Sequence, residues 1–223
     1  MTKAVELLER LEMPPVSVKT LLLEPNSVYL EDELAECTDK MKEKPGDWAN
    51  THLDTLRSKG LGWSALSPPT AMQSNPWFAN TLCPREKQVL IYNISVLQHE
   101  RKLLSVDVSQ RIDRCPKGWD DELATVVPRA KVWLVDEERL LTGWESMRVQ
   151  GFPKAVLERA LSAGTLPGGS DLRDLAGNAF SSTTFAACYM SLLANLPSTL
   201  WKDSAIVSHA INFNDVASAM LAD

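Results

Sequence analysis

The sequence is poor in the residues from which metal centres and disulfide frameworks are built. It has four cysteines and three histidines in 223 residues, and no two cysteines form a Cys-x-x-Cys pair. Cysteines and histidines scattered in this way are not typical of a zinc site. We therefore expect no metal centre, and we expect the cysteines to be reduced thiols inside a cell. Two of the histidines, His52 and His99, have no visible partner and are expected at the surface or half-buried.

Long apolar segments are also missing. No run of apolar residues approaches the roughly 20 that are needed to span a bilayer. The first ten residues have the amphipathic, partly acidic pattern of a helix, which is not the pattern of a signal or transit peptide. With 44% hydrophobic and 23% charged residues, the composition is that of an ordinary soluble globular protein. We expect a soluble intracellular protein without a membrane partner, located in the nucleus if the source is eukaryotic.

The sequence has no overall excess of positive charge. Its net charge is −6 and its isoelectric point is about 5.2. Because proteins gain non-specific affinity for nucleic acids by neutralising phosphates, this balance argues against a stand-alone nucleic-acid binder. Basic residues nevertheless gather in the middle of the chain: Arg85, Lys87, Arg101, Lys102, Arg111, Arg114, Lys117, Arg129 and Lys131. They form either a stripe that faces DNA or a solvated surface of mixed charge, and the sequence is consistent with both interpretations.

Two motifs in the second half of the chain are its most informative features. The first is Arg139-Leu-Leu-Thr-Gly-Trp-Glu-Ser-Met-Arg-Val-Gln-Gly-Phe-Pro153, and the second is Leu175-Ala-Gly-Asn-Ala-Phe180. In this order they resemble the ninth and tenth motifs of the DNA (cytosine-5) methyltransferases, Arg-x-Leu-Thr-x-x-Glu-x-x-Arg-x-Gln-Gly-Phe-Pro and Gly-Asn-Ala/Ser. The matching residues are Arg139, Leu141, Thr142, Glu145, Arg148, Gln150, Gly151, Phe152, Pro153, Gly177, Asn178 and Ala179. The resemblance is specific at 139–153, fair at 175–180 and vague over the rest of 15–196.

The resemblance implies covalent catalysis, and the residues for that chemistry are missing. In the family a cysteine thiolate in Pro-Cys-Gln attacks cytosine carbon 6, and a glutamate in Glu-Asn-Val supports the ring nitrogen of the flipped base. This sequence contains neither a Pro-Cys nor a Glu-Asn dipeptide, and Cys83 and Cys115 precede their prolines instead of following them. The pair Gly60 and Gly62 has no strand before it and no helix after it, so it is not a nucleotide-binding loop. We therefore assign no catalytic residue.

By this resemblance the chain corresponds to the C-terminal part of such an enzyme. It is then a truncated gene product, one half of a split enzyme, or a degenerate paralogue. Its expected partners are DNA and an N-terminal catalytic half supplied in trans. S-adenosylmethionine is expected to bind only when that half is present. The alternative function is a non-catalytic DNA-binding or protein-interaction module derived from the same fold.

The resemblance also implies candidate binding residues. Gly177, Asn178 and Ala179 would lie at the methionine end of S-adenosylmethionine, although Asn178 alone is equally consistent with a helix C-cap. In the recognition-like region, Arg111 and Arg114 are the candidate DNA contacts. Thr125 is a third candidate, because its hydroxyl could meet a DNA phosphate. A threonine at a strand edge is the simpler explanation of Thr125.

The remaining motif residues are expected to act structurally. Thr142 and Glu145 have the spacing of a capping box, in which each side chain bonds the backbone N–H of the other residue. Arg148 either pairs with Glu145 on the helix surface or organises the base of the recognition region, as in the family. Gln150-Gly151-Phe152-Pro153 is expected to be a helix-to-helix turn, because Gly tolerates a left-handed backbone and Pro begins helices well.

Periodicity predicts a mixed α/β or α+β fold, rich in helix. By resemblance it would be a small recognition subdomain followed by the return segment of a Rossmann-like methyltransferase. The expected regions are 1–45, leading into the recognition region; 46–138, resembling that region; 139–200, the return segment; and 201–223, a tail. Helices are predicted at 2–11, 28–41, 48–56, 84–100, 142–150, 154–161, 171–174 and 182–196, strands at 18–23, 104–112, 124–127 and 132–135, a loop at 60–76 and a turn at 115–118.

Overall fold

The computed structural model describes residues 17–39, 46–97 and 101–179. The chain divides into two compact units. The larger unit holds Ser17–Met147 together with Pro167–Asn178, and the described part of the smaller unit is 148–166 with Ala179. The predicted helices at 2–11 and 182–196 lie outside the described residues.

The larger unit contains a four-stranded antiparallel sheet. Its strands are β1 (Leu103–Asp107), β2 (Lys117–Trp119), β3 (Val132–Leu134) and β4 (Arg139–Leu140), in the order β2-β1-β3-β4. In the register of the central strands, Val106 lies opposite Trp133, and Trp133 lies opposite Leu140. The described residues contain no parallel strand pair, so the fold is mixed in the coarse sense predicted, while a Rossmann-like sheet is not seen in this part of the chain.

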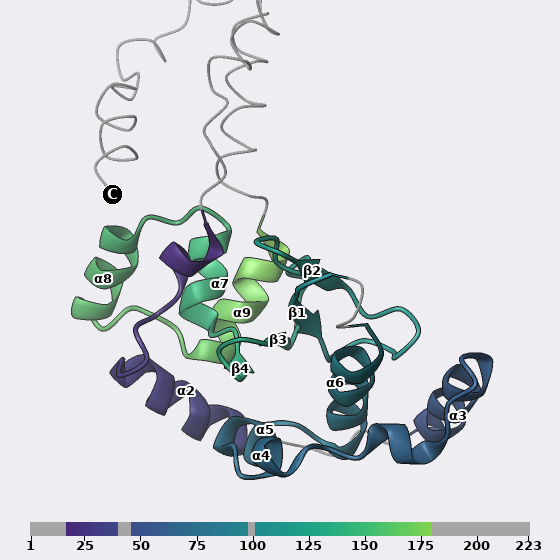
Figure 1. The fold of residues 1–223 in the computed structure, drawn as a ribbon. Helices are drawn as coiled ribbons and strands as arrows, with labels where there is room; N and C mark the ends of the chain where they lie inside the picture. Colours follow the sequence, from purple (N-terminus) through teal and green to yellow (C-terminus); the bar gives the residue numbers. More distant parts are fainter. Residues whose placement is uncertain (1–16, 40–45, 98–100, 180–223) are drawn as a thin grey trace, which may run out of the picture. The chain divides into compact units, whose positions relative to one another are not determined.

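The larger unit also contains several helices. They are α2 (Val28–Asp39), α3 (Trp48–Ser58), α4 (Thr70–Gln73), α5 (Pro76–Thr81), α6 (Pro84–Leu97) and α9 (Gly169–Asn178), with two 3-10 turns, η1 (Val18–Leu21) and η2 (Trp63–Leu66). Helix α7 (Gly143–Val149) follows β4 directly, and α8 (Lys154–Ser162) belongs to the smaller unit. Helix α6 packs on β1, whereas α2 contacts both α5 and α9 (Figure 1).

The main core lies between α6 and the sheet. It is built from fully buried apolar side chains that include Leu82, Leu90, Val106 and Trp133. Burying a side chain of this size contributes about 1.5–3 kcal/mol, so this cluster supplies much of the stability of the larger unit. A smaller cluster around Val132, Leu134 and Leu141 lies next to the segment that connects β2 to β3.

Several predicted elements are confirmed and others are wrong. The helices at α2, α3, α6, α7 and α8 and the strand at β3 are confirmed. The predicted strand at 18–23 is a 3-10 turn instead, because its backbone N–H groups bond side chains: Val18 donates to Asp121 and Leu23 donates to Glu145. The predicted strand at 124–127 is irregular, and the N–H of Ala124 bonds the hydroxyl of Ser105.

The predicted strand at 104–112 is shorter than expected. It ends at Asp107, whose carboxylate accepts the N–H of Ser109 and turns the chain. Every residue of β1 is buried, so neither face of this strand is exposed to solvent. The loop predicted at 60–76 contains η2 and α4, the single turn predicted at 171–174 is the longer helix α9, and the turn predicted at 115–118 runs into β2.

Candidate functional site

The ninth-motif residues meet at a buried carboxylate. Glu145 is 0% exposed and Arg139 is 5% exposed. The guanidinium of Arg139 donates two hydrogen bonds to Glu145, at 2.8 Å to Oε2 and 2.7 Å to Oε1. A bidentate arginine–carboxylate pair is among the stronger polar contacts in proteins because both ions keep their hydrogen bonds when water is excluded. This pair connects β4 to α7.

Thr142 and Glu145 form the predicted capping box. The N–H of Thr142 donates to Glu145 Oε2 at 2.9 Å, and the N–H of Glu145 donates to the Thr142 hydroxyl at 3.1 Å. The Thr142 hydroxyl also donates to Oε2 at 3.0 Å. Two N–H groups at the start of α7 that lack intrahelical partners are thereby satisfied. The prediction of a helix start at this point is confirmed.

The same carboxylate reaches a distant part of the chain. The N–H of Leu23 donates to Glu145 Oε1 at 2.7 Å, although the two residues are 122 positions apart. Nearby, the ring of Tyr29 on α2 stacks on Trp144, with centroids 4.9 Å apart and planes 14° from parallel. The ninth motif therefore holds the segment that precedes α2 against the start of α7.

Helix α2 presents two carboxylates to the other helices of this region. Glu36 accepts the N–H groups of Gly169 at 2.8 Å and Ser170 at 3.2 Å, where a carboxylate is favoured by the dipole of α9. Glu33 forms an ion pair with Arg173 of α9 and accepts the N–H of Gly143 at 3.3 Å. Burial lowers the pKa of Arg173 to about 10, and Asp174 opposes this shift. The contacts fix α9 against α2.

The segment after α7 has the predicted turn. Gly151 has a φ of 86° and its N–H donates to the carbonyl of Arg148 at 2.8 Å, while Pro153 is the N-cap of α8. Gln150 and Phe152 are half-buried. The pairing of Arg148 with Glu145 that the sequence left open is wrong, because Arg139 binds that carboxylate. The organising role of Arg148 stays a prediction, since the described residues give its half-buried side chain no hydrogen bond or ion pair.

The tenth-motif residues do not by themselves form a cofactor pocket in the described part of the chain. A Cβ on Gly177 would overlap the backbone of Val127 and Pro128, so packing alone explains why glycine stands there. Asn178 is exposed, ends α9 and donates its side-chain amide to the carbonyl of Asp174 at 2.8 Å. Ala179 is half-buried. The described residues therefore do not fit S-adenosylmethionine unaided, and binding it would require groups from elsewhere.

The three DNA-contact candidates are exposed, and of these only the two arginines share a partner. Arg111 and Arg114 both approach the carboxylate of Asp113, at 3.3 Å and 3.5 Å. Thr125 is exposed on the segment between β2 and β3, and no contact recorded for the described residues joins it to the two arginines. Both arginines are accessible to a phosphate, because their side chains are 60% and 77% exposed.

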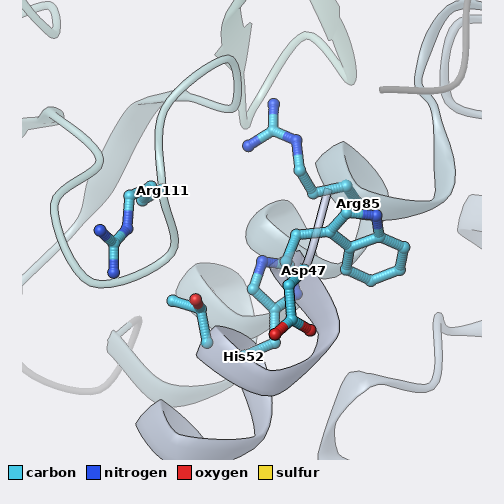
Figure 2. A pocket seen from close by; sticks show the side chains of 6 residues that line it. Asp47, His52, Arg85 and Arg111 are labelled. Atoms are coloured by element: carbon cyan, nitrogen blue, oxygen red, sulfur yellow. The ribbon is translucent and has the colours of Figure 1, made fainter. Parts of the chain in front are cut away.

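Arg111 also lines a cavity that the sequence did not predict. The cavity has a volume of about 240 Å³, and its lining residues are Asp47, Trp48, Thr51, His52, Arg85 and Arg111 (Figure 2). The only sequence signal was the predicted helix at 48–56, which places Trp48 and His52 one turn apart. The expectation that His52 lies at the surface or half-buried, without a partner, is wrong, because the residue is 1% exposed and its Nδ1 lies 2.8 Å from Gln88 Oε1.

The titration of His52 provides a test of this packing. Burial lowers the pKa of His52 below its usual 6.5; the bond to Gln88 partly opposes the shift and the charge of Arg85 adds to it. Because the folded state then binds the proton less tightly than the unfolded state, the contribution to stability is complete above pH 6.5. It is lost progressively as the pH falls from 6.5 through the lower folded pKa. We expect NMR titration, with His52→Gln to assign the signal, to give a pKa below 6.5. A value of 6.5 or higher would contradict the buried, neutral imidazole.

No site for a metal ion is formed by three or more His, Cys, Asp or Glu side chains within the described ranges. In the same part of the chain, no helix is both long and apolar enough to cross a membrane. Comparison of the whole chain with protein-family models and with curated proteins finds no match.

Proposed function

We propose that the chain is the C-terminal portion of a DNA (cytosine-5) methyltransferase. It would take part in methyl transfer from S-adenosylmethionine to cytosine in DNA only together with a catalytic portion. That portion would supply the nucleophilic thiolate, the supporting glutamate and the Gly-rich cofactor loop. The ninth-motif residues would hold the recognition-like region and α9, the helix that carries Gly177 and Asn178, in fixed positions.

The observation that carries this proposal is the way the ninth motif folds. Its matching residues Arg139, Thr142 and Glu145 are buried together and satisfy one another's hydrogen bonds. A chance sequence match would place most charged residues on a solvated surface, where they need no partner. Here the motif positions are interdependent, which supports a structural motif. The separation in sequence of Leu23 from Glu145 further supports a role in joining two regions of the chain.

The exposed arginines Arg111 and Arg114 would contact DNA. Arg111 and Arg114 share a single aspartate, so one positive charge of the three groups is not balanced within this cluster. Such side chains position a duplex through its phosphates without reading its sequence. Thr125 stays a candidate phosphate contact, because its hydroxyl is exposed.

The first test is activity of the chain alone. We expect the purified protein, mixed with DNA and S-adenosylmethionine carrying a radiolabelled methyl group, to transfer no label to cytosine. The reason is that the sequence contains no Pro-Cys-Gln nucleophile. An active cytosine-5 methyltransferase serves as the positive control. Incorporation that persists when all four cysteines (Cys37, Cys83, Cys115 and Cys188) are replaced by serine would point to contamination. Incorporation that a single one of these substitutions abolishes would show a different catalytic cysteine and overturn the proposal.

A second candidate function follows from the packing of Gly177. Because its close approach to Val127 and Pro128 needs no ligand, the chain is also consistent with a non-catalytic module that binds DNA or another protein. The two candidates differ in one measurable property. The enzyme portion should restore methyl transfer when it is combined with a catalytic portion, and the module should not.

A further inference from the structure

The cavity near Arg111 combines groups from three elements of the larger unit. Helix α3 and its N-cap supply Asp47, Trp48, Thr51 and His52, α6 supplies Arg85, and the segment after β1 supplies Arg111 (Figure 2). Among these six residues, the proposed function assigns a role to Arg111 alone. Their chemistry indicates the class of ligand that the cavity accepts.

Arg85 places a buried positive charge in the cavity wall. Its side chain is 9% exposed, and its terminal nitrogens donate to the carbonyls of Gln110 at 2.7 Å and Ser109 at 3.0 Å. Its Nε is buried and has no hydrogen-bond partner among the described residues. The nearest carboxylate oxygen, on Glu86, lies 3.7 Å away, and the other oxygen of that carboxylate is bound by Lys131 at 2.9 Å. Arg85 and Lys131 thus share one carboxylate, so these three groups together carry one net positive charge next to the cavity.

A second arginine of the lining adds to this positive charge. Arg111, whose side chain is 60% exposed, shares Asp113 with Arg114, while Asp47 is the acidic residue of the lining. The charged groups of the lining and their ion-pair partners comprise four positive charges (Arg85, Arg111, Arg114 and Lys131) and three negative charges (Asp47, Asp113 and Glu86). The surroundings therefore carry one net positive charge, in a chain whose net charge is −6. His52 adds no charge near pH 7, because burial lowers its pKa.

Trp48 supplies an aromatic face to the same cavity. Its ring is half-buried and tilted at 57° to the ring of His52, with centroids 5.3 Å apart. A half-exposed indole next to positive charge is the combination that binds nucleotides, because the base stacks on the ring and the phosphate meets the cation.

The volume of the cavity indicates whether its ligand is a complete small molecule or one unit of a longer molecule. At about 240 Å³ it is smaller than the roughly 300–1,000 Å³ that enclose a complete drug-sized ligand. We propose that the cavity accepts one unstacked nucleotide of a DNA strand, with its base on Trp48 and its phosphate at Arg111 and Arg85. The inference rests on the proposed function only in taking DNA as the partner.

Fluorescence anisotropy on the full chain tests this proposal. The probes are a short fluorescein-labelled single strand and the fully paired duplex of the same sequence, with deoxycytidine monophosphate and inorganic phosphate as competitors. Trp48→Ala should weaken binding of the single strand by about 5- to 100-fold, and Trp48→Phe should restore most of it. Duplex binding should change by less than about twofold, because a paired base must first be unpaired and unstacked, which costs free energy, before it can reach the indole ring.

Arg111→Ala should weaken binding and lower the slope of log affinity against log salt by about 0.7 for the single strand. Its matched control is Arg57→Ala, which removes an arginine that is 69% exposed on the same helix as Trp48 but outside the cavity lining. This control should leave the slope and the effect of Trp48 unchanged. Circular dichroism checks that each variant is folded.

The outcomes separate the two proposals. If DNA binds and the Trp48 variants bind it like the parent, the cavity proposal fails and the proposed function stands. Equal losses for duplex and single strand would show a simple phosphate contact and overturn the nucleotide site. Competition by the free mononucleotide as strong as by the strand would show a small-molecule site instead. If neither the single strand nor the duplex binds, the cavity proposal and the proposed contact with DNA are both overturned.

Discussion

Glu145→Ala is expected to lower the free energy of unfolding by about 3–5 kcal/mol, because it leaves the buried guanidinium of Arg139 without its counter-ion. The substitution also removes the acceptor for the N–H groups of Thr142 and Leu23. For a domain of this size, 1 kcal/mol shifts the melting temperature by about 2–4 °C. Urea denaturation of parent and variant measures the difference directly.

Two variants control this prediction. Glu158→Ala removes a carboxylate from α8 that is 52% exposed and pairs with Lys154 at 3.6 Å. It should change stability by less than about 0.5 kcal/mol. Arg139→Ala should cost about as much as Glu145→Ala, and the double variant should cost clearly less than the two losses added, because both residues act in one network. Additive losses would contradict the buried pair.

Gly177→Ala is expected to destabilise the larger unit by about 1–3 kcal/mol or more, as overpacking usually does. The new Cβ would overlap the backbone of Val127 and Pro128, which cannot rotate away as a side chain can. Helix propensity alone would give the opposite sign, since alanine in a helix is favoured over glycine by about 1 kcal/mol. The sign of the change therefore decides between close packing and intrinsic propensity.

The melting temperature of the Gly177→Ala variant, measured without cofactor, decides between these two effects. Gly62→Ala is the matched control, because the nearest atom that its Cβ would meet is Ser64 Oγ at 3.8 Å. If Gly177→Ala were as harmless as Gly62→Ala, the contact with Val127 and Pro128 would be wrong. The glycine would then need another explanation, such as a cofactor that approaches the backbone.

The features predictable from the sequence are those that depend on neighbouring residues. The capping box requires only Thr142 and Glu145 three positions apart, and the turn between α7 and α8 requires only Gly151 and Pro153. Both are local, so their residue types predict them. The start of α6 is also predictable from a single residue type, because Pro84 begins the helix.

The features that the sequence could not predict depend on distant packing. Arg139 binds Glu145 from β4, six positions before it and outside the helix of Glu145, while the sequence suggested Arg148 from helical spacing alone. Leu23 looked like part of a strand, yet its N–H is bound by a carboxylate 122 residues away. The cavity between Trp48 and Arg85 exists only because α3 and α6 meet, which no spacing along the chain reveals.

Complementation is the most direct measurement of the central claim. The partner is the catalytic portion of a cytosine-5 methyltransferase, carrying the Gly-rich loop, Pro-Cys-Gln and Glu-Asn-Val but lacking its own ninth and tenth motifs. Its own C-terminal portion, added back in trans, is the positive control. We predict that radiolabelled methyl groups reach cytosine when this chain is mixed with that partner, that neither protein is active alone, and that Asn178→Asp weakens the transfer. If the control restores activity and this chain does not, the chain is not the C-terminal portion of such an enzyme.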